Sequence, residues 1–356
     1  MRRLLFTACV PLLVLACAHT PPKSEVVWPQ PPEKPRIRFV RALSSQAALD
    51  TGGFSAVARA LTGDRTGLTL RNPMGLVLSD DGHLLFVADG ILRRIVVVDL
   101  VRNEMGVFAP DQPLGTPFGI ALDADGSVYV ADSENHEVHV FDKDGNTLRV
   151  YGRGDLVRPT GLALDRARRL VYVVDTANQG SDAHGVVVFH ADTGQVLRRL
   201  GDQDGGGRRG DAPGQFYFPT YLTLDEGSNV YVCDTLNFRI QVFTPDGALV
   251  RLIGEAGDGP GTLNKAKGLA FDGFGNLYVV DSGHGVVQLF NRQDQLLLSF
   301  GGFAPDLLEY FDSPSAIAID PRTNHIYVAN TAAPRVNVYE LINTTAEDSL
   351  PPAVAR

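Results

Sequence analysis

The sequence contains few cysteines, a single tryptophan and fewer basic than acidic residues. Of the three cysteines among 356 residues, Cys9 and Cys17 lie within the first seventeen. Only Cys233 is then left for the folded part, which excludes a disulfide framework there. The 32 basic residues are outnumbered by 41 acidic ones, and the net charge is −9. An acidic surface argues against sequence-independent nucleic-acid binding, because such binding depends on Lys and Arg neutralising phosphates.

What the composition does supply is typical of a globular chain with many turns. Hydrophobic residues make up 44% and charged residues 21%, which are ordinary values for a folded domain. The 37 glycines and 22 prolines indicate frequent turns. At this length the chain is either one large domain or two ordinary ones.

The first residues have the pattern of a secretory signal. Two arginines precede an apolar run, residues 4–16, that is too short to span a bilayer as a helix. The run ends in Val-Leu-Ala-Cys17, which resembles a bacterial lipobox, where a small residue precedes the lipidated cysteine. We predict a lipoprotein signal peptide over residues 1–16 and lipidation of Cys17; a cleaved secretory signal with an incidental cysteine is the alternative. Because Ala18 rather than aspartate follows, lipoprotein sorting implies the outer membrane, facing the periplasm or the exterior.

A proline-rich segment follows the lipidation site. Residues 18–35 contain six prolines, a composition that favours an extended chain over a core. We predict that residues 17–35 form a tether between the lipid and the folded body. Trp28, the only tryptophan, either docks on the body or simply marks the linker.

Beyond this segment the chain repeats itself six times. Each copy has an apolar strand, a Gly- or Asp-containing turn, a second apolar strand, a loop, and one or two further strands. The second strands close, at spacings of 43, 43, 59, 47 and 49 residues, on Asp89, Asp132, Asp175, Asp234, Asp281 and Asn330. Periods of this size with several short strands predict an all-β, six-bladed β-propeller of four-stranded antiparallel blades.

The repeated motifs resemble those of the NHL repeat family. They are Gly-Leu/Ile-Ala-Leu-Asp, then Tyr-Val-x-Asp, then Asn-x-Arg-Ile/Val, and the resemblance covers about residues 73–341. The fourth copy carries most of them, with Asp234, Asn237 and Arg239. The resemblance implies a propeller body over residues 36–341. RNA binding, known in some members of the family, does not fit secretion and a negative charge.

The sixth copy lacks its fourth strand, and the other end of the body offers a replacement. Residues 36–44 have the apolar spacing of a fourth strand, so we predict that they pair with the last strand and close the ring. Residues 46–72 form an insertion, in which Phe-Ser-Ala-Val-Ala-Arg-Ala-Leu predicts a short helix. Residues 342–356 are expected to be a disordered tail.

Aligning the six copies separates scaffold positions from variable ones. Cys233 falls among small apolar residues, so we interpret it as a buried hydrophobe rather than a reactive thiol. The aspartate after it is repeated in most copies, and we interpret it as an acceptor of backbone N–H bonds in the loop that follows. The loops after the second strands and the connections between blades vary, and there we expect function.

This variable face supplies the residues predicted to bind a partner. The connection before the fourth copy is glycine-rich and carries two arginines, which can bind a carboxylate through two hydrogen bonds. The variable columns of the second-strand loops supply most of the others. The predicted binding residues are Arg94, Arg208, Arg209, Tyr221, Asn237, Phe238, Arg239 and Arg335.

Three histidines on the same face raise an alternative. His136, His184 and His284 come from three different copies, and three imidazoles around an open position can hold zinc. The arrangement resembles the peptide-amidating lyases, a six-bladed family whose histidines bind a metal; Tyr221 and Arg94 are the candidates for its tyrosine and arginine. A surface or structural role for each histidine is the competing interpretation.

The sequence therefore predicts a lipid-anchored propeller of the cell envelope, with a monomeric body that binds a protein or peptide through its loops. This function requires no catalytic residue and no cofactor. The alternative is a metal-dependent lyase or hydrolase at the channel mouth, with zinc or calcium as the metal.

Overall fold

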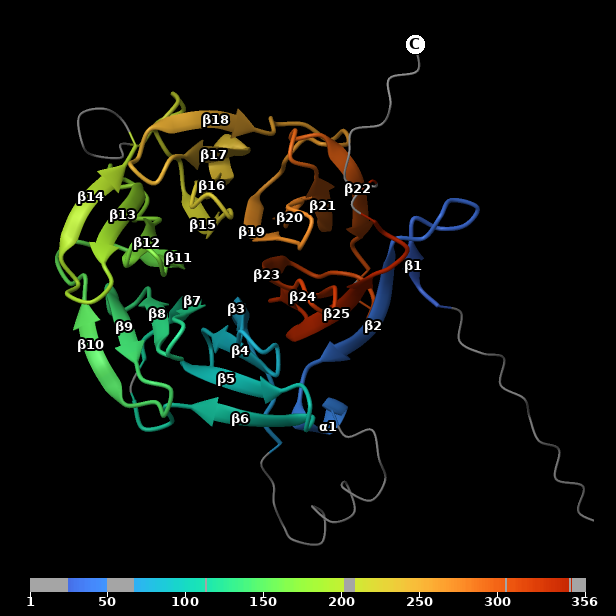
Figure 1. The fold of residues 1–356 in the computed structure, drawn as a ribbon, viewed down its shortest axis with the longest axis horizontal. Helices are drawn as coiled ribbons and strands as arrows, with labels where there is room; N and C mark the ends of the chain where they lie inside the picture. The colour runs from blue at the N-terminus through green and yellow to red at the C-terminus, as the bar shows by residue number, and fades with distance from the viewer. Residues whose placement is uncertain are drawn as a thin grey trace, which may run out of the picture.

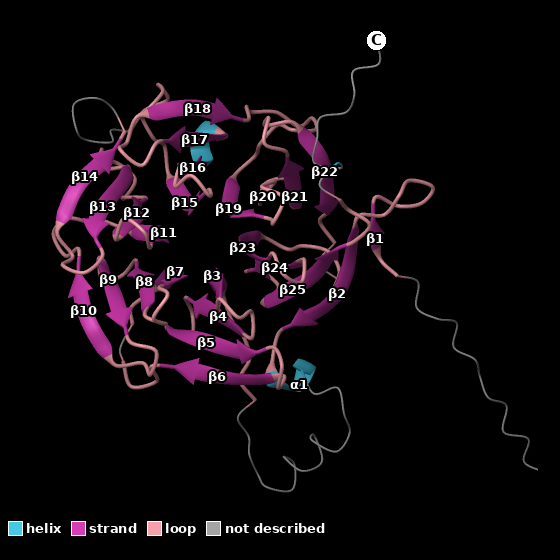
Figure 2. Cartoon of the chain, in the orientation of Figure 1, coloured by secondary structure: helices cyan, strands magenta, loops and turns pink. Residues whose placement is uncertain are grey.

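Six antiparallel β-sheets stand around a central axis, and Figure 1 views the ring along that axis. The computed structural model describes residues 25–49, 67–112, 114–201, 209–304, 306–345 and 347. Strands account for nearly all of the regular structure, as Figure 2 shows. The prediction of an all-β, six-bladed propeller is confirmed.

In blades one to five the strands run in chain order from the axis to the rim, whereas the fourth strand of blade six comes from the start of the body. Blades one and two consist of β3 (Pro73–Leu78), β4 (Leu84–Asp89), β5 (Arg94–Asp99), β6 (Glu104–Phe108), β7 (Pro117–Leu122), β8 (Val128–Asp132), β9 (Glu137–Phe141) and β10 (Thr147–Tyr151). Blades three and four consist of β11 (Pro159–Asp165), β12 (Leu170–Asp175), β13 (Gly185–His190), β14 (Val196–Leu200), β15 (Pro219–Leu224), β16 (Val230–Asp234), β17 (Arg239–Phe243) and β18 (Leu249–Ile253). Blades five and six consist of β19 (Ala266–Phe271), β20 (Leu277–Asp281), β21 (Val286–Phe290), β22 (Leu296–Gly301), β23 (Pro314–Asp320), β24 (His325–Asn330), β25 (Arg335–Leu341) and β2 (Ile37–Leu43).

The first strand of the body closes the ring. β2 pairs antiparallel with β25, and the register joins Ile37 to Leu341 and Leu43 to Val336. In Figure 1 the blue β2 lies against the red β25. The predicted closing strand is therefore confirmed, and it covers the outer edge of β25, which would otherwise be unpaired.

Part of the proline-rich segment belongs to the body. β1 (Val27–Trp28) pairs with β2 and adds a fifth strand to blade six. Trp28 is only 8% exposed, and its ring lies 5.8 Å from that of Tyr339 and 5.9 Å from that of Tyr310. An indole buried among aromatic rings is held by a large apolar contact. Val27 and Trp28 thus belong to blade six, and an exposed turn joins them to β2, which corrects the predicted tether for this part of 17–35.

The predicted insertion and tail are described only in part. A short helix, α1 (Gln46–Leu49), opens the insertion, whereas the residues predicted to be helical, 54–61, lie outside the described ones. The start of the tail continues on the body, because the Ile342 N–H donates to the Arg36 carbonyl at 2.7 Å. Most of residues 346–356 lie outside the described part. No helix in the described ranges is long and apolar enough to cross a membrane.

The core lies between the blades. Neighbouring sheets pack face to face, so both faces of the second strands are covered, and every residue of β8, β16 and β20 is buried. This is why these strands are continuous apolar runs rather than alternating ones. The rim strands β10 and β18 are mostly exposed.

The ring has two faces, which we name by their connections. The loop face carries the turns from the second to the third strand of each blade and the connections between blades. The hairpin face carries the turns between the first and second strands and between the third and fourth strands. Each first strand begins at the loop face, at the mouth of the central channel.

Candidate functional site

The aspartates that close the second strands hold the loop face together. The Asp89 carboxylate accepts the Arg71 N–H at 2.7 Å from the preceding connection, and the Leu92 N–H at 3.0 Å from the loop that follows. Asp132 likewise accepts the Gly115 N–H at 2.6 Å. The predicted structural role is correct, but the sequence analysis named only the loop that follows the strand. Each carboxylate also fixes the connection that leads into its own blade.

Cys233 is part of this scaffold. Its side chain is fully buried, its thiol donates to the carbonyl of Lys267 in the next blade, and burial raises its pKa well above the ordinary value. A thiol with a raised pKa is a poor nucleophile. The structural interpretation of Cys233 therefore agrees with its surroundings.

Several residues predicted to bind a partner instead bind the chain itself. Arg239 donates to Asp234 Oδ2 at 2.9 Å and to the carbonyls of Asp211 and Ala212 at 2.7 and 2.9 Å. Asn237 donates to Asp234 Oδ2 at 2.8 Å and also to the Gly210 carbonyl. These donors clamp the long connection before blade four, so they are not available to a partner.

Arg335 has the same kind of role in blade six. It is 6% exposed and donates to the Tyr310 carbonyl at 2.9 Å and to Asn337 Oδ1 at 3.0 Å. It thus holds the connection between blades five and six. A buried arginine satisfied by carbonyls serves the fold.

Tyr221 lies inside the channel rather than on the surface. Four of the other five first strands hold glycine at the equivalent position, and blade six holds Ala316, because neighbouring blades approach closely there; a Cβ at Gly75 would lie 2.0 Å from the Phe118 carbonyl oxygen. Tyr221 occupies this column in blade four and is 7% exposed. Its hydroxyl donates to the Met74 carbonyl at 2.5 Å, in the opposite blade of the ring (Figure 1). Tyr221 is therefore a strut across the channel.

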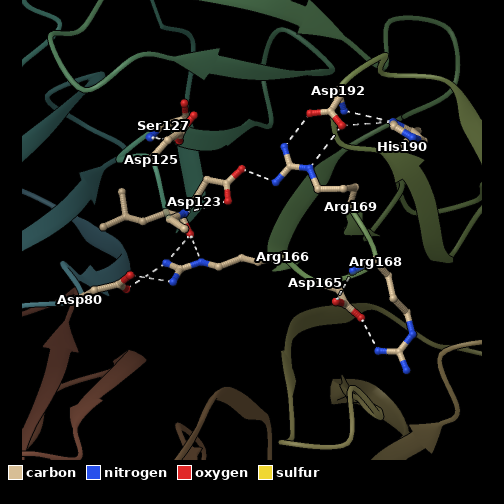
Figure 3. Close-up of polar contacts among 12 residues, drawn as sticks. Asp80, Asp123, Asp125, Ser127, Asp165, Arg166, Arg168, Arg169, His190 and Asp192 are labelled. Atoms are coloured by element: carbon tan, nitrogen blue, oxygen red, sulfur yellow. Dashed lines mark hydrogen bonds and ion pairs between the residues drawn. The ribbon is translucent and has the colours of Figure 1, made fainter.

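The strut lines a cavity of about 390 Å³ that is otherwise bounded by the first strands of all six blades. At its other end Arg166 forms a pair with Asp80 at 2.8 Å and donates to the Leu122 carbonyl at 3.0 Å. Blades one, two and three are thereby joined across the hairpin face, as Figure 3 shows. Both ends of the channel are crossed by side chains.

Of the remaining predicted residues, three can be placed. Arg94 is exposed, and its Nε donates only to the Leu92 carbonyl, at 3.2 Å. Phe238 is partly exposed and has a φ of 56°, the left-handed conformation, at the end of the turn Thr235–Asn237. Arg209 is exposed and is discussed below, whereas Arg208 lies outside the described residues.

The structure does not bring the three histidines together. His136 Nδ1 contacts the Val157 carbonyl, His284 Nδ1 lies 2.8 Å from Asp281 Oδ2, and His184 packs on Phe218. Within the described part of the chain, no three His, Cys, Asp or Glu side chains form a group that could hold a metal. The residues proposed for a metal site therefore do not fit one.

The loop face does contain an aromatic cluster between blades three and four, which we call the Arg209 cluster. It consists of His184, Arg209, Tyr217 and Phe218. The Arg209 guanidinium lies 4.8 Å from the Tyr217 ring centre, and Phe218 lies 4.8 Å from the His184 ring. Arg209 Nη2 also donates to the Tyr217 hydroxyl at 3.2 Å, and stacking leaves the other guanidinium donors at the edges of the group.

His184 gives this cluster an unusual feature. Its side chain is fully buried, and neither ring nitrogen makes a hydrogen bond of normal geometry with the described residues. Burial lowers the pKa of His184, so the ring is neutral at pH 7. A buried polar ring without partners destabilises the free protein, and such groups concentrate at functional sites.

Carboxylates pair with arginines on both faces; on the loop face Arg93 lies 3.4 Å from Glu134 and Arg239 lies 2.9 Å from Asp234. On the hairpin face Arg169 bridges Asp123 and Asp192, and Arg168 lies 3.0 Å from Asp165 (Figure 3). Further pairs there are Arg102–Asp99, Lys143–Asp144, Arg251–Asp294, Arg292–Glu226 and Arg322–Asp320. By contrast, Arg209 on the loop face has no carboxylate partner among the residues described.

The comparisons with known proteins agree with this architecture. A family model described as the SMP-30/Gluconolactonase/LRE-like region matches residues 46–154. NHL repeat-containing protein 2 of Bos taurus is 29% identical over 96 residues, which are 23% of this chain and 13% of that protein. The chain is a six-bladed β-propeller that is similar to NHL repeat proteins.

Two further relatives bear on the range of functions. The mouse peptidyl-glycine alpha-amidating monooxygenase is 27% identical over 164 residues, 43% of this propeller and 16% of that enzyme. A structure of a Bacteroides thetaiotaomicron protein of unknown function superposes with a TM-score of 0.59 at 20% identity, covering 76% of this propeller and 70% of that chain. This propeller spans less than a fifth of each curated relative, and the structural likeness shows the fold alone.

Proposed function

We propose that this propeller is a binding module that takes a protein or peptide on its loop face, at the Arg209 cluster, and that a lipid on Cys17 anchors it in the cell envelope. The observation that carries the proposal is the exposed Arg209 guanidinium, which stacks on Tyr217 beside His184 and has no carboxylate partner among the described residues. Arginine and aromatic residues are the side chains that most often dominate protein interfaces.

The paired hairpin face supports the choice of surface. Arginines there are held by carboxylates of the same chain, so a partner would have to break those pairs to use them. On the loop face Arg209 needs no such exchange. The predicted envelope location supports a partner in the periplasm or at the cell surface, with an acidic or C-terminal carboxylate for the arginine to bind.

Site-specific photo-crosslinking in the native host tests the binding proposal. A photoreactive phenylalanine analogue at position 217 is expected to trap one defined partner, and the same analogue at Lys143, on the hairpin face, is the control. Arg209→Ser should reduce the trapped product at least tenfold without changing the amount of protein. The same products from positions 217 and 143, or no effect of Arg209→Ser, would count against this surface.

The anchor is tested separately. Metabolic labelling with an alkyne fatty acid should label the wild-type protein, and Cys17→Ser should lose both the label and sedimentation with the outer membrane. If Cys17→Ser is unlabelled but still sediments with the membrane, the lipid does not provide the anchor.

The lyase alternative lacks a supporting geometry. It was predicted from His136, His184 and His284, and these three side chains contact separate parts of the scaffold. We therefore assign no reaction to the channel mouth.

A further inference from the structure

Lys267 occupies a special position at the loop-face end of the channel. It is the second residue of β19, the innermost strand of blade five. The equivalent residues of the other blades are Met74, Phe118, Thr160, Thr220 and Ser315. The position is therefore either apolar or hydroxylic in the other five blades.

The hydroxyl groups at this position join neighbouring blades. Thr160 Oγ1 donates to the Thr220 carbonyl at 2.8 Å, and Ser315 Oγ donates to the Pro73 carbonyl at 3.0 Å. Thr220 Oγ1 lies 2.6 Å from Thr235 Oγ1. A polar side chain here thus has an internal partner, and an apolar one needs none.

Lys267 departs from both patterns. Its side chain is partly buried, and its ammonium group makes no hydrogen bond or ion pair with any residue that the structure describes. Burial, and to a smaller degree the neighbouring charge of Lys265, lower the pKa of Lys267. Lys265 is exposed and equally without a partner in the described ranges. A partly desolvated cation next to a like charge destabilises the free protein.

The acids that close the second strands beside this segment, Asp234 and Asp281, are already engaged within the chain. Asp281 accepts the Asn264 N–H at 2.8 Å and lies 2.8 Å from His284 Nδ1. Asp234 is held by Arg239 at 2.9 Å. The positive charge at positions 265 and 267 is therefore left for a group from outside the chain.

The backbone around the two lysines is fixed in advance. Thr235 Oγ1 donates to the Ala266 carbonyl at 2.8 Å, and the Ser282 N–H donates to the Lys265 carbonyl at 3.2 Å. The Cys233 thiol donates to the Lys267 carbonyl. Because three consecutive carbonyls are held by blades four and five, a ligand would not have to order this segment.

We propose that Lys265 and Lys267 form a binding site for one carboxylate group of a peptide or protein ligand at the mouth of the channel. The inference rests on the proposed binding function and deepens it, because it names the group that enters the mouth. A peptide C-terminus and the side chain of Asp or Glu carry the same chemistry. Either one would supply the counter-ion that the two ammonium groups lack.

Lysine NMR can test this directly because the chain has only five lysines. The full-length protein, purified in detergent and labelled with ¹³C-lysine, would be titrated with acetyl-Gly-Ala-Ala carrying a free C-terminus. We expect saturable shifts of the Lys265 and Lys267 signals, with a Kd near 1 mM, typical of a weak single contact. Lys143, which is paired with Asp144, is the internal control.

Two further peptides distinguish a C-terminal carboxylate from a side-chain carboxylate as the bound group. The amidated peptide should bind at least tenfold more weakly, and acetyl-Ala-Glu-Ala-amide reports whether a side-chain carboxylate suffices. Equal shifts of Lys265 and Lys267 with the free and amidated peptides would overturn the proposal. A stronger response to inorganic phosphate than to any carboxylate would overturn the choice of ligand.

Lys267→Met distinguishes a binding role from a structural one. Because methionine occupies this position in blade one, the variant should fold and melt at the same or a higher temperature, yet lose the shift of the Lys265 signal. A variant that is destabilised would show that Lys267 serves the fold. These peptides do not require the natural partner. A failure of crosslinking at position 217 therefore leaves the lysine site intact, and a failure of the peptide titration leaves the binding surface at the Arg209 cluster intact.

Discussion

The strut formed by Tyr221 allows a prediction with a worked magnitude. Tyr221→Phe keeps the ring but removes the hydroxyl that donates to the Met74 carbonyl across the channel. The net contribution of such a hydrogen bond is about 0.5–1.5 kcal/mol, and leaving a buried carbonyl without its donor costs about 1–3 kcal/mol. We expect Tyr221→Phe to lower the free energy of unfolding by about 1–2 kcal/mol.

Tyr221→Gly introduces the glycine found at the equivalent position of four other blades but removes the tyrosine ring. The side chain is 93% buried and its ring lies 5.3 Å from that of Phe118, so truncation leaves a void in the channel. Removing a buried aromatic side chain costs about 3–5 kcal/mol, and glycine in a strand adds about 0.5–1 kcal/mol. The expected loss is therefore at least twice that of Tyr221→Phe.

Urea unfolding measures both effects. Trp28, the only tryptophan, is buried in blade six and reports unfolding by its fluorescence. Tyr217→Phe is the matched control, because that hydroxyl accepts from the exposed Arg209 at 3.2 Å and should contribute less than about 0.5 kcal/mol. If Tyr221→Gly were neutral or stabilising, the channel strut would have no energetic role and the reasoning would be refuted.

Three other predictions follow from buried groups. Arg239→Ala should lower the free energy of unfolding by about 3–5 kcal/mol, because Asp234 would stay buried without its cation; a normal urea midpoint would contradict this. Burial lowers the pKa of His184 below the ordinary 6.5, so the unfolded chain binds the proton more readily and stability should fall as pH drops through 6.5, by at most about 1.4 kcal/mol per pH unit. His184→Phe should flatten that slope in urea titrations at several pH values; an unchanged slope would point to other groups. Trp28→Ala should cost about 3–5 kcal/mol in thermal unfolding monitored by circular dichroism, whereas a tether residue would cost nothing measurable.

Most of the fold could be predicted from local patterns. The hairpin turns are stabilised by residues within the turn itself. Asp225, for example, accepts the N–H groups of Gly227 and Asn229, and turns of this kind recur along the chain. The closing strand was found because its apolar spacing matches the missing fourth strand. β1 was not found, because a two-residue pairing leaves no pattern in a proline-rich segment.

The candidate site was harder to predict because residues at equivalent positions differ between blades for two reasons, scaffolding and binding. Asn237 and Arg239 differ from their equivalents because they hold a connection that only blade four has, so variation there reflected scaffolding rather than binding. Lys267 lies at a position where the six blades have unlike residues, so the aligned copies did not indicate a site there. Only contacts with the neighbouring blades show that the hydroxyl groups of Thr160 and Ser315 have internal partners and that Lys267 has none among the described residues.

The sequence by itself determined the number of blades, the order of their strands and the closure of the ring, since these depend on repeated local patterns of apolar residues and turns. The tertiary structure alone decided which polar side chains are already bound to other parts of the chain. Arg166 and Asp80 are 86 residues apart and meet only because the ring places blades one and three around one mouth. Whether a charge is paired depends on such distant neighbours, and the free charges that suit a partner are those that the ring leaves unpaired.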